Sequence, residues 1–323
     1  MRAAVLHKLG ETPRYETFPE PVAGQGEAVV EVLAAALKPI DRWMADGSHY
    51  AAYREFPVVA GADGVGRLDD GRRVVFFAPV RPYGGMAERA LVRAGLWVPV
   101  PDEVDDVTAA AVANPGMAAW KSLVWRGGLR PGQTVLVLGA TGASGRIAVQ
   151  LAKRHGAGHV IAAGRNEAVL AELRSLGADE VLRLDVPAPE LVEAFSASAA
   201  AHPYDLVLDY VWGAPAQALF QALTSPDLFP SDDRERILHV QVGQVAGDAI
   251  SLNANTLRST PLEIVGSGTG TSPSPAEAMS AFGALLTDAG SGAIRIATEA
   301  RPLSDVGAAW GEGSGGARVV FVP

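Results

Sequence analysis

Three glycines, each three residues from the next, follow an apolar and β-branched run near the middle of the chain. The run covers residues 134–138, and the glycines are Gly139, Gly142 and Gly145. Apolar residues after them recur on one helical face, so the stretch predicts a strand, a tight turn and a helix. A glycine turn lets the backbone approach a pyrophosphate, and the free N–H groups and positive dipole at the helix N-terminus favour its negative charge. The residues expected to hold such a group are Thr141, Gly142, Ala143 and Ser144.

The next corner of the chain indicates which dinucleotide would bind. About twenty residues after such a turn, the usual dinucleotide fold presents an acidic residue to the adenosine ribose. This chain has Gly164, Arg165 and Asn166 there, after a second strand-like run over residues 159–163. A carboxylate repels a 2′-phosphate, whereas a guanidinium binds it bidentately, so the corner predicts NADPH rather than NADH. The alternative is that Arg165 is a solvated surface charge.

Composition narrows the class of protein. A chain of 323 residues exceeds one typical core, and 48% hydrophobic with 20% charged residues is ordinary for a soluble globular protein. The formal net charge of −9 argues against nucleic acid or an anionic membrane as a partner, because both need clustered Lys and Arg. No apolar run approaches the roughly 20 residues of a membrane span, and the N-terminus has no signal-peptide core. We therefore expect a cytoplasmic protein.

The side chains that usually bind metals are few. The chain contains no cysteine, which excludes a disulfide, a thiolate nucleophile and a cysteine-ligated zinc ion. His155 and His159 are four residues apart, but the glycines between them break the helix that would align them. The other histidines share no metal-ligand spacing. The prediction is therefore that no metal site exists.

The elements that position these residues fall into three parts. Residues 1–112 show short β-rich runs separated by Gly and Pro, which predicts a compact, barrel-like β domain. Within this domain, residues 37–50 form a polar and aromatic stretch between two strands that could reach a cleft. Residues 113–265 alternate strand-like and helical patterns, which predicts a doubly wound parallel sheet. Residues 266–323 are expected to return to the first domain.

The parallel sheet also suggests where its ligand lies. Ligands of such sheets bind beyond the carboxyl ends of the strands. The turns after two later strands therefore become candidate cofactor neighbours. Val211 lies in the first of these turns and is a candidate cofactor contact. Val242 and Gly243 lie at the second, and we expect them on the nicotinamide side of the cofactor.

Four motifs in order carry a resemblance that extends along nearly the whole chain. They are residues 58–66 (VVAGADGVG), 130–137 (RPGQTVLV), 139–145 (GATGASG) and 176–179 (LGAD). The chain resembles the medium-chain dehydrogenase/reductase superfamily, in particular its zinc-independent quinone oxidoreductase and enoyl reductase branches. The resemblance implies a GroES-like β-rich barrel domain and a Rossmann-type NADP-binding domain. It also implies a homodimer through edge pairing of a last strand over residues 262–265, which would be an unpaired edge in a monomer.

The resemblance also suggests the reaction. Zinc-dependent members place a Cys near residues 38–41 and a His at the position of Ala62, and this chain has neither. A carbonyl-polarising zinc is therefore not expected. The chemistry that the resemblance then implies is hydride transfer from NADPH to a small-molecule substrate, either a quinone or a C=C bond conjugated to a carbonyl.

Two positions are nominated beside the reacting groups. Residues 114–118 are similar to a segment that lies beside the nicotinamide in enoyl thioester reductases, although Met117 replaces a hydrogen-bonding Thr. Those enzymes carry a Tyr in a Gly-x-Tyr context, which suggests Tyr50 as a catalytic residue, because a phenol can donate to an enolate. The alternative for Tyr50 is a lid or packing aromatic.

Lys38 is the second catalytic candidate. It stands where quinone reductases commonly have an Asn, and it either polarises a substrate carbonyl or pairs with Asp41 or Asp63. Two other functions stay open beside the quinone or enone reductase. One is an enoyl-thioester reductase that acts on acyl-CoA or acyl-carrier substrates. The other is a catalytically silent NADP(H)-binding sensor or structural protein, which the loss of the Thr at Met117 favours.

Overall fold

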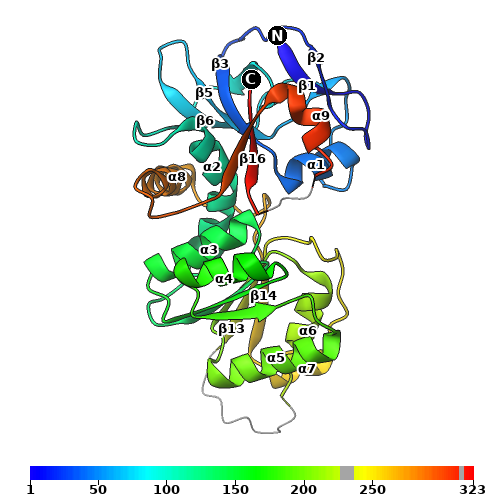
Figure 1. Cartoon of the computed structure of the whole chain (residues 1–323), viewed down its shortest axis with the longest axis vertical. Coiled ribbons are helices and arrows are strands. Elements are labelled where there is room, and N and C mark those ends of the chain that lie inside the picture. The colour runs from blue at the N-terminus through cyan, green and yellow to red at the C-terminus, as the bar shows by residue number, and fades with distance from the viewer. Residues whose placement is uncertain (226–235, 313–315) are drawn as a thin grey trace. The chain divides into compact units, whose positions relative to one another are not determined.

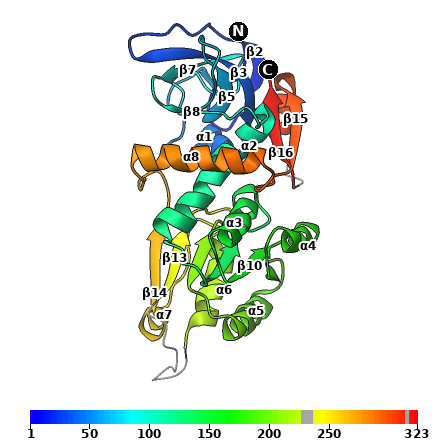
Figure 2. The same ribbon diagram turned by 90° about the vertical axis from the view of Figure 1, so that its left-hand side faces the viewer.

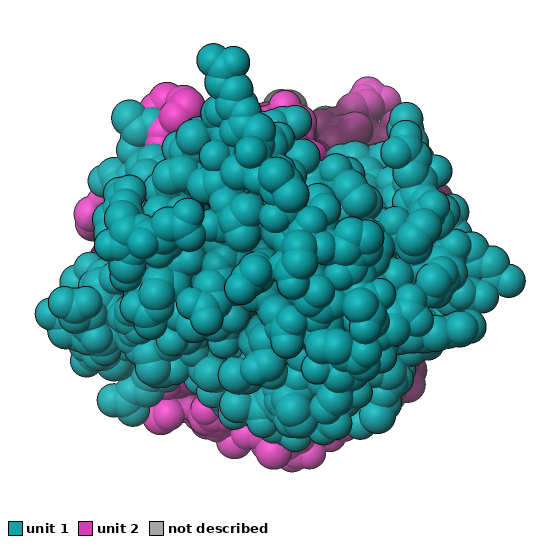
Figure 3. Space-filling model, turned by 90° about the horizontal axis from the view of Figure 1, so that it is seen from above, with its two compact units in different colours: residues 1–114, 276–323 teal, residues 115–275 magenta. Residues whose placement is uncertain are grey.

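The computed structural model describes residues 1–225, 236–312 and 316–323. These residues form two compact units, which Figure 3 shows in different colours. The first unit contains residues 1–114 and 276–323, and the second contains residues 115–275. The predicted boundaries follow residues 112 and 265. The second unit instead extends to residue 275, so residues 266–275 lie with it.

The first unit is rich in short strands. Its strands are β1 (Arg2–Leu6), β2 (Arg14–Thr17), β3 (Glu27–Ala36), β4 (Val58–Val59), β5 (Asp63–Arg67), β6 (Arg73–Phe77), β7 (Arg89–Arg93), β8 (Trp97–Pro99), β15 (Thr298–Pro302) and β16 (Arg318–Val322). Its helical elements are α1 (Pro39–Asp46), η2 (Leu303–Asp305), α9 (Val306–Ala309) and most of α8 (Pro275–Gly290), while α2 (Asp106–Trp120) crosses the boundary at residue 114.

The C-terminal strand completes the larger sheet of the first unit. That sheet has the order β15-β16-β3-β5-β6-β8, with β7 also paired to β3, and a smaller sheet has the order β2-β1-β4. β16 runs antiparallel to β3, with Val320 opposite Ala36 and Phe321 opposite Ala35. Figure 1 shows β16 beside β3 although the two come from opposite ends of the chain. Because Val320 and Phe321 are fully buried, this returning strand supplies part of the core.

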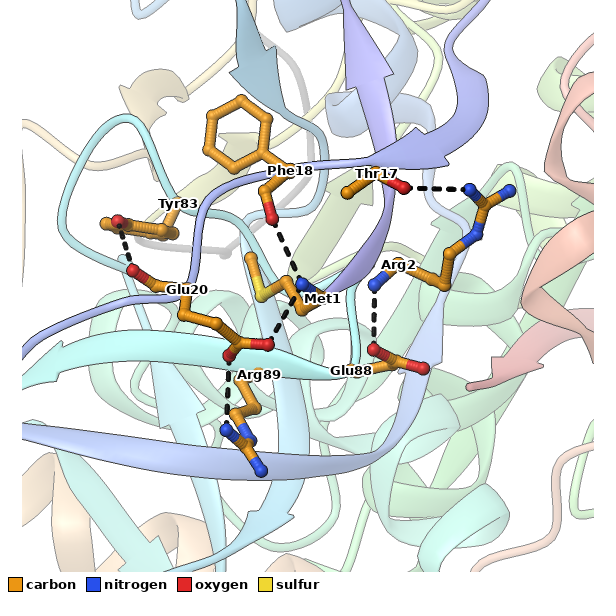
Figure 4. A network of polar contacts seen from close by, with 8 residues as sticks. All are labelled: Met1, Arg2, Thr17, Phe18, Glu20, Tyr83, Glu88 and Arg89. Carbon is orange, nitrogen blue, oxygen red and sulfur yellow. Dashed lines mark hydrogen bonds and ion pairs between the residues drawn. The ribbon is translucent and has the colours of Figure 1, made fainter.

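An exposed polar network ties the start of β1 to β7 (Figure 4). Glu20 accepts a hydrogen bond from Arg89 at 3.1 Å and pairs with the amino group of Met1 at 2.9 Å. The same amino group donates to the carbonyl of Phe18 at 3.0 Å. The hydrogen bond from Met1 is the main reason why the pKa of Glu20 lies below its usual value. Exposed ion pairs stabilise little, so this network fixes local geometry more than stability.

The second unit contains a parallel sheet covered on both faces. Its strands are β9 (Thr134–Leu138), β10 (His159–Gly164), β11 (Glu180–Arg183), β12 (Leu206–Asp209), β13 (Ile237–Gln241) and β14 (Leu262–Gly266). Its helices are the π-helix η1 (Lys121–Arg126), α3 (Ala143–Arg154), α4 (Glu167–Ser175), α5 (Ala188–Ala201), α6 (Gly213–Leu223) and α7 (Ala254–Ser259). Figure 1 shows α3 and α4 on one face of the sheet and α5, α6 and α7 on the other.

The strand order of this sheet confirms the predicted doubly wound fold. Neighbouring strands are parallel and follow the order β11-β10-β9-β12-β13-β14. Numbered along the chain this is 3-2-1-4-5-6, the order of dinucleotide-binding sheets, which bind their ligand where the order reverses. The reversal lies between β9 and β12. Figure 2 shows β14 at one edge of the sheet beside β13.

The polar and aromatic stretch over residues 37–50, to which the sequence pattern assigned no helix or strand, is partly helical. It contains α1, which has Pro39 in its first turn and ends at Gly47 with φ +90°. Proline suits the first helical turn because its missing N–H has no partner there, and a left-handed glycine is a common helix end. Met44 and Ala45 are buried, so α1 contributes one face to the core of the first unit. A helix of eight residues is too short for its apolar period to stand out in the sequence.

Candidate functional site

The turn after β9 is shaped by glycines at close backbone contacts. Gly139 has φ +86°, and a Cβ atom there would lie 2.8 Å from Val211 Cγ1. A Cβ on Gly145 would lie 2.3 Å from the carbonyl oxygen of Gly139 and 2.6 Å from Ala140 Cα. The helix therefore packs against the strand as closely as backbones allow. The result is a concave turn without side chains at its base, which fits a pyrophosphate.

The N-terminus of α3 is open above this turn. Gly142 is its N-cap, and no side chain within the described chain caps the first N–H groups of the helix. Ala143 and Ser144 form its first turn and are half-buried, while Gly142 is exposed. Unpaired N–H groups at the start of a helix of this length bind anions. The structure thus brings Thr141, Gly142, Ala143 and Ser144 together at the carboxyl edge of the sheet, as the motif predicted.

The corner after β10 contacts the same turn. A Cβ on Gly164 would lie 2.4 Å from Thr141 Cγ2, so a glycine is needed for the two turns to touch. Arg165 follows it and is exposed at the carboxyl edge. Asn166 has a local role, because its side-chain oxygen accepts a hydrogen bond from the N–H of Val169 at 3.1 Å and caps α4. Of the predicted trio, Arg165 is therefore the residue whose position suits an anionic group of a ligand.

Arg183 is a further cation that the sequence reasoning missed. It ends β11, the strand next to β10, and its guanidinium hydrogen-bonds to Asp185 at 2.7 and 3.0 Å. The pKa of Asp185 is lowered mainly by this hydrogen bond, and the charge of Arg165 contributes as well. The two arginines therefore lie near the same carboxylate at the carboxyl edge of the sheet. The sequence feature that could have indicated Arg183 is a basic residue at the carboxyl end of β11, the parallel strand that follows β10.

The turns after β12 and β13 interlock on the other side of the glycine turn. The N–H groups of Val242 and Gly243 donate to the carbonyl of Asp209 at 2.8 and 3.1 Å. A Cβ on Gly243 would lie 2.5 Å from the carbonyl oxygen of Tyr210. Since Gly139 lies against Val211 and Gly243 lies against Tyr210, the predicted neighbours Val211, Val242 and Gly243 belong to turns packed beside the glycine turn.

The helical segment that carries Met117 is linked to the turn after β12. Met117 is half-buried on the part of α2 that lies in the second unit. Ser122, on the π-helix that follows, donates to the carbonyl of Ala118 at 2.8 Å and bonds to the hydroxyl of Tyr210 at 3.1 Å. Burial raises the pKa of Tyr210. That tyrosine is therefore a neutral structural link between this helical segment and the turn after β12.

Lys38 lies in a buried ion cluster rather than in an open position. Its ammonium is within 2.8 Å of Asp63, 3.2 Å of Asp41 and 2.9 Å of the carbonyl of Ala36, and its side chain is 1% exposed. Burial alone would lower the pKa of Lys38, but the two carboxylates outweigh burial and raise it. With its donors directed at these partners, Lys38 does not fit the expected polarisation of a substrate carbonyl. The alternative pairing with Asp41 and Asp63 is what the structure contains.

Tyr50 lies on the surface of the first unit just after α1. It is 69% exposed, and its ring packs on that of His49 with centroids 4.0 Å apart. Burial lowers the pKa of His49. Neither aromatic belongs to the buried cluster around Lys38. The catalytic role of Tyr50 stays a prediction.

Metal ligands and membrane-spanning helices can be judged from the residues that the structure describes. No group of three or more His, Asp or Glu side chains in that part of the chain is arranged to hold a metal ion. The position where zinc-dependent relatives carry a His is Ala62, whose N–H donates to Asp41 at 2.9 Å. Among the helices that the structure describes, none has both the length and the apolar character needed to cross a membrane.

Comparison with known proteins places this geometry among oxidoreductases. Residues 143–227 match the family described as zinc-binding dehydrogenase. The chain is 30% identical over 246 residues to the mitochondrial NAD(P)H oxidoreductase RTN4IP1 of Drosophila melanogaster, covering 65% of this chain and 58% of the fly protein. It is 27% identical over 351 residues to the probable NADPH-dependent quinone reductase tdiC of Emericella nidulans, covering 96% of both.

A solved structure agrees over the full length. The quinone oxidoreductase of Thermus thermophilus, studied alone and with NADPH, is 29% identical, superposes with a TM-score of 0.82 and covers 100% of both chains. This agreement and the strand order confirm the predicted combination of a Rossmann-type sheet with a GroES-like β-rich domain. The comparisons confirm the predicted resemblance of this chain to the medium-chain dehydrogenase/reductase superfamily, in its quinone oxidoreductase branch.

Proposed function

We propose that this chain is an NADPH-dependent oxidoreductase that reduces quinones or α,β-unsaturated carbonyl compounds without a metal ion. The observation that carries the proposal is the glycine turn under the open N-terminus of α3, at the point where the strand order reverses. The printed names of its relatives, an NAD(P)H oxidoreductase and a probable quinone reductase, support this reading. An acyl thioester is the competing substrate.

The residues present fit NADPH along the whole carboxyl edge. The N–H groups of Gly142, Ala143 and Ser144 would bind the pyrophosphate, with the hydroxyl of Thr141 beside them. Arg165 would bind the 2′-phosphate, because it is exposed and follows a glycine that touches the same turn. Val211, Val242, Gly243 and Met117 would line the nicotinamide side. NADPH supplies the hydride when bound, and these residues orient it.

Substrate class is decided by direct assay of the native chain. A simple quinone, an enone and a crotonyl thioester should be compared as acceptors at saturating NADPH. We expect turnover of the quinone or enone to exceed that of the thioester, because long acyl carriers need cationic groups for their phosphates. NADPH binding without turnover of any acceptor would instead favour the silent nucleotide-binding protein.

Replacing Arg165 by alanine is expected to change the cofactor preference. The KM for NADPH should rise by about ten- to a hundredfold, the range for a lost hydrogen bond between charged groups, while the KM for NADH stays within about twofold. Steady-state rates with both cofactors measure this. Arg174→Ala is the matched control, because Arg174 is also on the surface but bonds to the carbonyl of Asp179 at the far end of α4. Equal efficiency of NADH and NADPH in the native protein would refute the role of Arg165.

We also propose that two copies pair through β14. This strand is the edge of the parallel sheet next to β13, and Leu262, Ile264 and Val265 are only half-buried in the single chain. An unpaired apolar edge favours association with a second strand. Sedimentation at micromolar concentration should therefore give the mass of two chains. A single-chain mass at that concentration would contradict edge pairing.

A further inference from the structure

A buried carboxylate organises the turn after β12. Asp209 is fully buried, and its Oδ1 atom accepts hydrogen bonds from the N–H groups of Val211 and Trp212, both at 2.8 Å. Its Oδ2 atom lies 3.0 Å from Nε2 of His239, on the neighbouring strand β13. Three donors thus converge on one side chain. A buried carboxylate needs such donors, and it holds the groups that provide them.

His239 completes this arrangement from the neighbouring strand. It is fully buried, and its ring packs against Phe220 and Trp212 with centroids 4.8 and 5.9 Å apart. Its second nitrogen, Nδ1, has no hydrogen-bond partner among the described residues. A buried Nδ1–H without an acceptor would be unfavourable, so the proton belongs on Nε2, where it is donated to Asp209. The hydrogen-bond network, not an observed hydrogen, assigns this tautomer.

The turn held by Asp209 is strained and has little room. Trp212 has φ +55°, a left-handed conformation that is rare for a residue with a bulky side chain. Gly213, at φ +58°, is so close to the next turn that a Cβ would lie 2.3 Å from the carbonyl oxygen of Ala246. The N–H of Ala246 donates to the carbonyl of Val211 at 2.8 Å. Strained backbone persists only where its surroundings determine it, and here they are Asp209 and the second turn.

We propose that His239 and Asp209 are a positioning pair for the nicotinamide half of the cofactor. His239 acts through Asp209, which holds Val211 by its side chain and Val242 and Gly243 by its carbonyl. The adenosine half lies at the other end of the site, on Gly164 and Arg165, and does not depend on this pair. The inference rests on the proposed NADPH function. It adds which buried residues give the nicotinamide side its shape.

The test separates the two halves of the cofactor. NADPH spans both halves, whereas adenosine 2′,5′-bisphosphate carries only the adenosine and its phosphates. Replacement of His239 by leucine should raise the Kd of NADPH by about tenfold, the effect of losing a hydrogen bond to a buried charge, and leave that of the bisphosphate within about twofold. The fluorescence enhancement of bound NADPH should fall as well. His239→Gln, whose side-chain amide reaches the position of Nε2, should restore NADPH affinity.

Controls distinguish positioning from general destabilisation. Thr260→Val removes another buried hydrogen bond of the second unit, from Thr260 to the carbonyl of Leu223 at 2.6 Å, away from the two turns. It should lower the melting temperature and leave both Kd values unchanged. If His239→Leu does not fold, His239→Asn, which is polar but too short to reach Asp209, takes its place in the comparison with His239→Gln.

The possible results test the positioning pair and the proposed NADPH function separately. Equal weakening of both ligands in the His239 variant, or no weakening of NADPH, would overturn the positioning pair. Native protein that binds neither NADPH nor the bisphosphate would overturn the proposed function itself. Selective weakening of NADPH, reversed by glutamine, is the result expected from the structure.

Discussion

Replacement of Lys38 by methionine is expected to lower the free energy of unfolding by about 3–5 kcal/mol. The side chains are similar in length, so the main loss is the ammonium that lies between Asp41 and Asp63. Both carboxylates are fully or almost fully buried, and without the ammonium they would lose this counter-ion. Because a domain is stable by only about 5–15 kcal/mol, the effect should be plain in urea or thermal unfolding.

Two comparisons make this result specific to the cluster. Lys8→Met is the matched control, since Lys8 pairs with Glu11 at 3.3 Å on the surface and its loss should change stability by less than about 1 kcal/mol. The pKa of Lys38 is raised, so its contribution is complete below the ordinary lysine pKa of about 10.4 and declines as pH rises through the folded value. The difference in free energy of unfolding between the native protein and Lys38→Met should therefore become smaller above about pH 10.4. Stability of Lys38→Met within error of the native protein would refute the structural role.

Replacement of Gly145 by alanine is expected to have the largest effect on cofactor binding. The new Cβ would lie 2.3 Å from the carbonyl oxygen of Gly139 and 2.6 Å from Ala140 Cα, both backbone atoms that cannot turn aside. α3 must then move away from β9, and its N–H groups leave the pyrophosphate. We expect the Kd of NADPH to rise on the order of a hundredfold, as two hydrogen bonds to a charged group are lost, with about 1–3 kcal/mol of destabilisation from overpacking.

Gly142 offers the control within the same turn. A Cβ there approaches the carbonyl oxygen of Gly139 only to 3.4 Å, and its φ of −81° suits any residue. Gly142→Ala should therefore change NADPH affinity far less than Gly145→Ala. Isothermal titration with NADPH, together with melting temperatures, measures both effects. Similar losses in the two variants would mean that close packing of α3 on β9 is not what shapes the site.

Sequence alone determined the features that depend on neighbours in the chain. The apolar runs and their spacing predicted the alternation of strands and helices, and the structure confirms it in the strand order of the second unit. Glycine spacing predicted the turn before α3, because the need for a residue without a Cβ is a local backbone property. The corner at Gly164 was found in the same way. NADPH follows from these local patterns and from the relatives.

Only the tertiary structure decided what distant residues do to one another. Lys38 and Asp63 are 25 positions apart, and Asp209 and His239 are 30 apart, so no periodicity connects either pair. Lys38 was a catalytic candidate by its type, but burial between two carboxylates makes it a structural cation. The sequence pattern predicts no role for His239, but its position in the sheet directs its Nε2 atom at Asp209. The physical reason is that the free energy of a charged or polar side chain is set by burial and partners, and strand order, not sequence distance, supplies both.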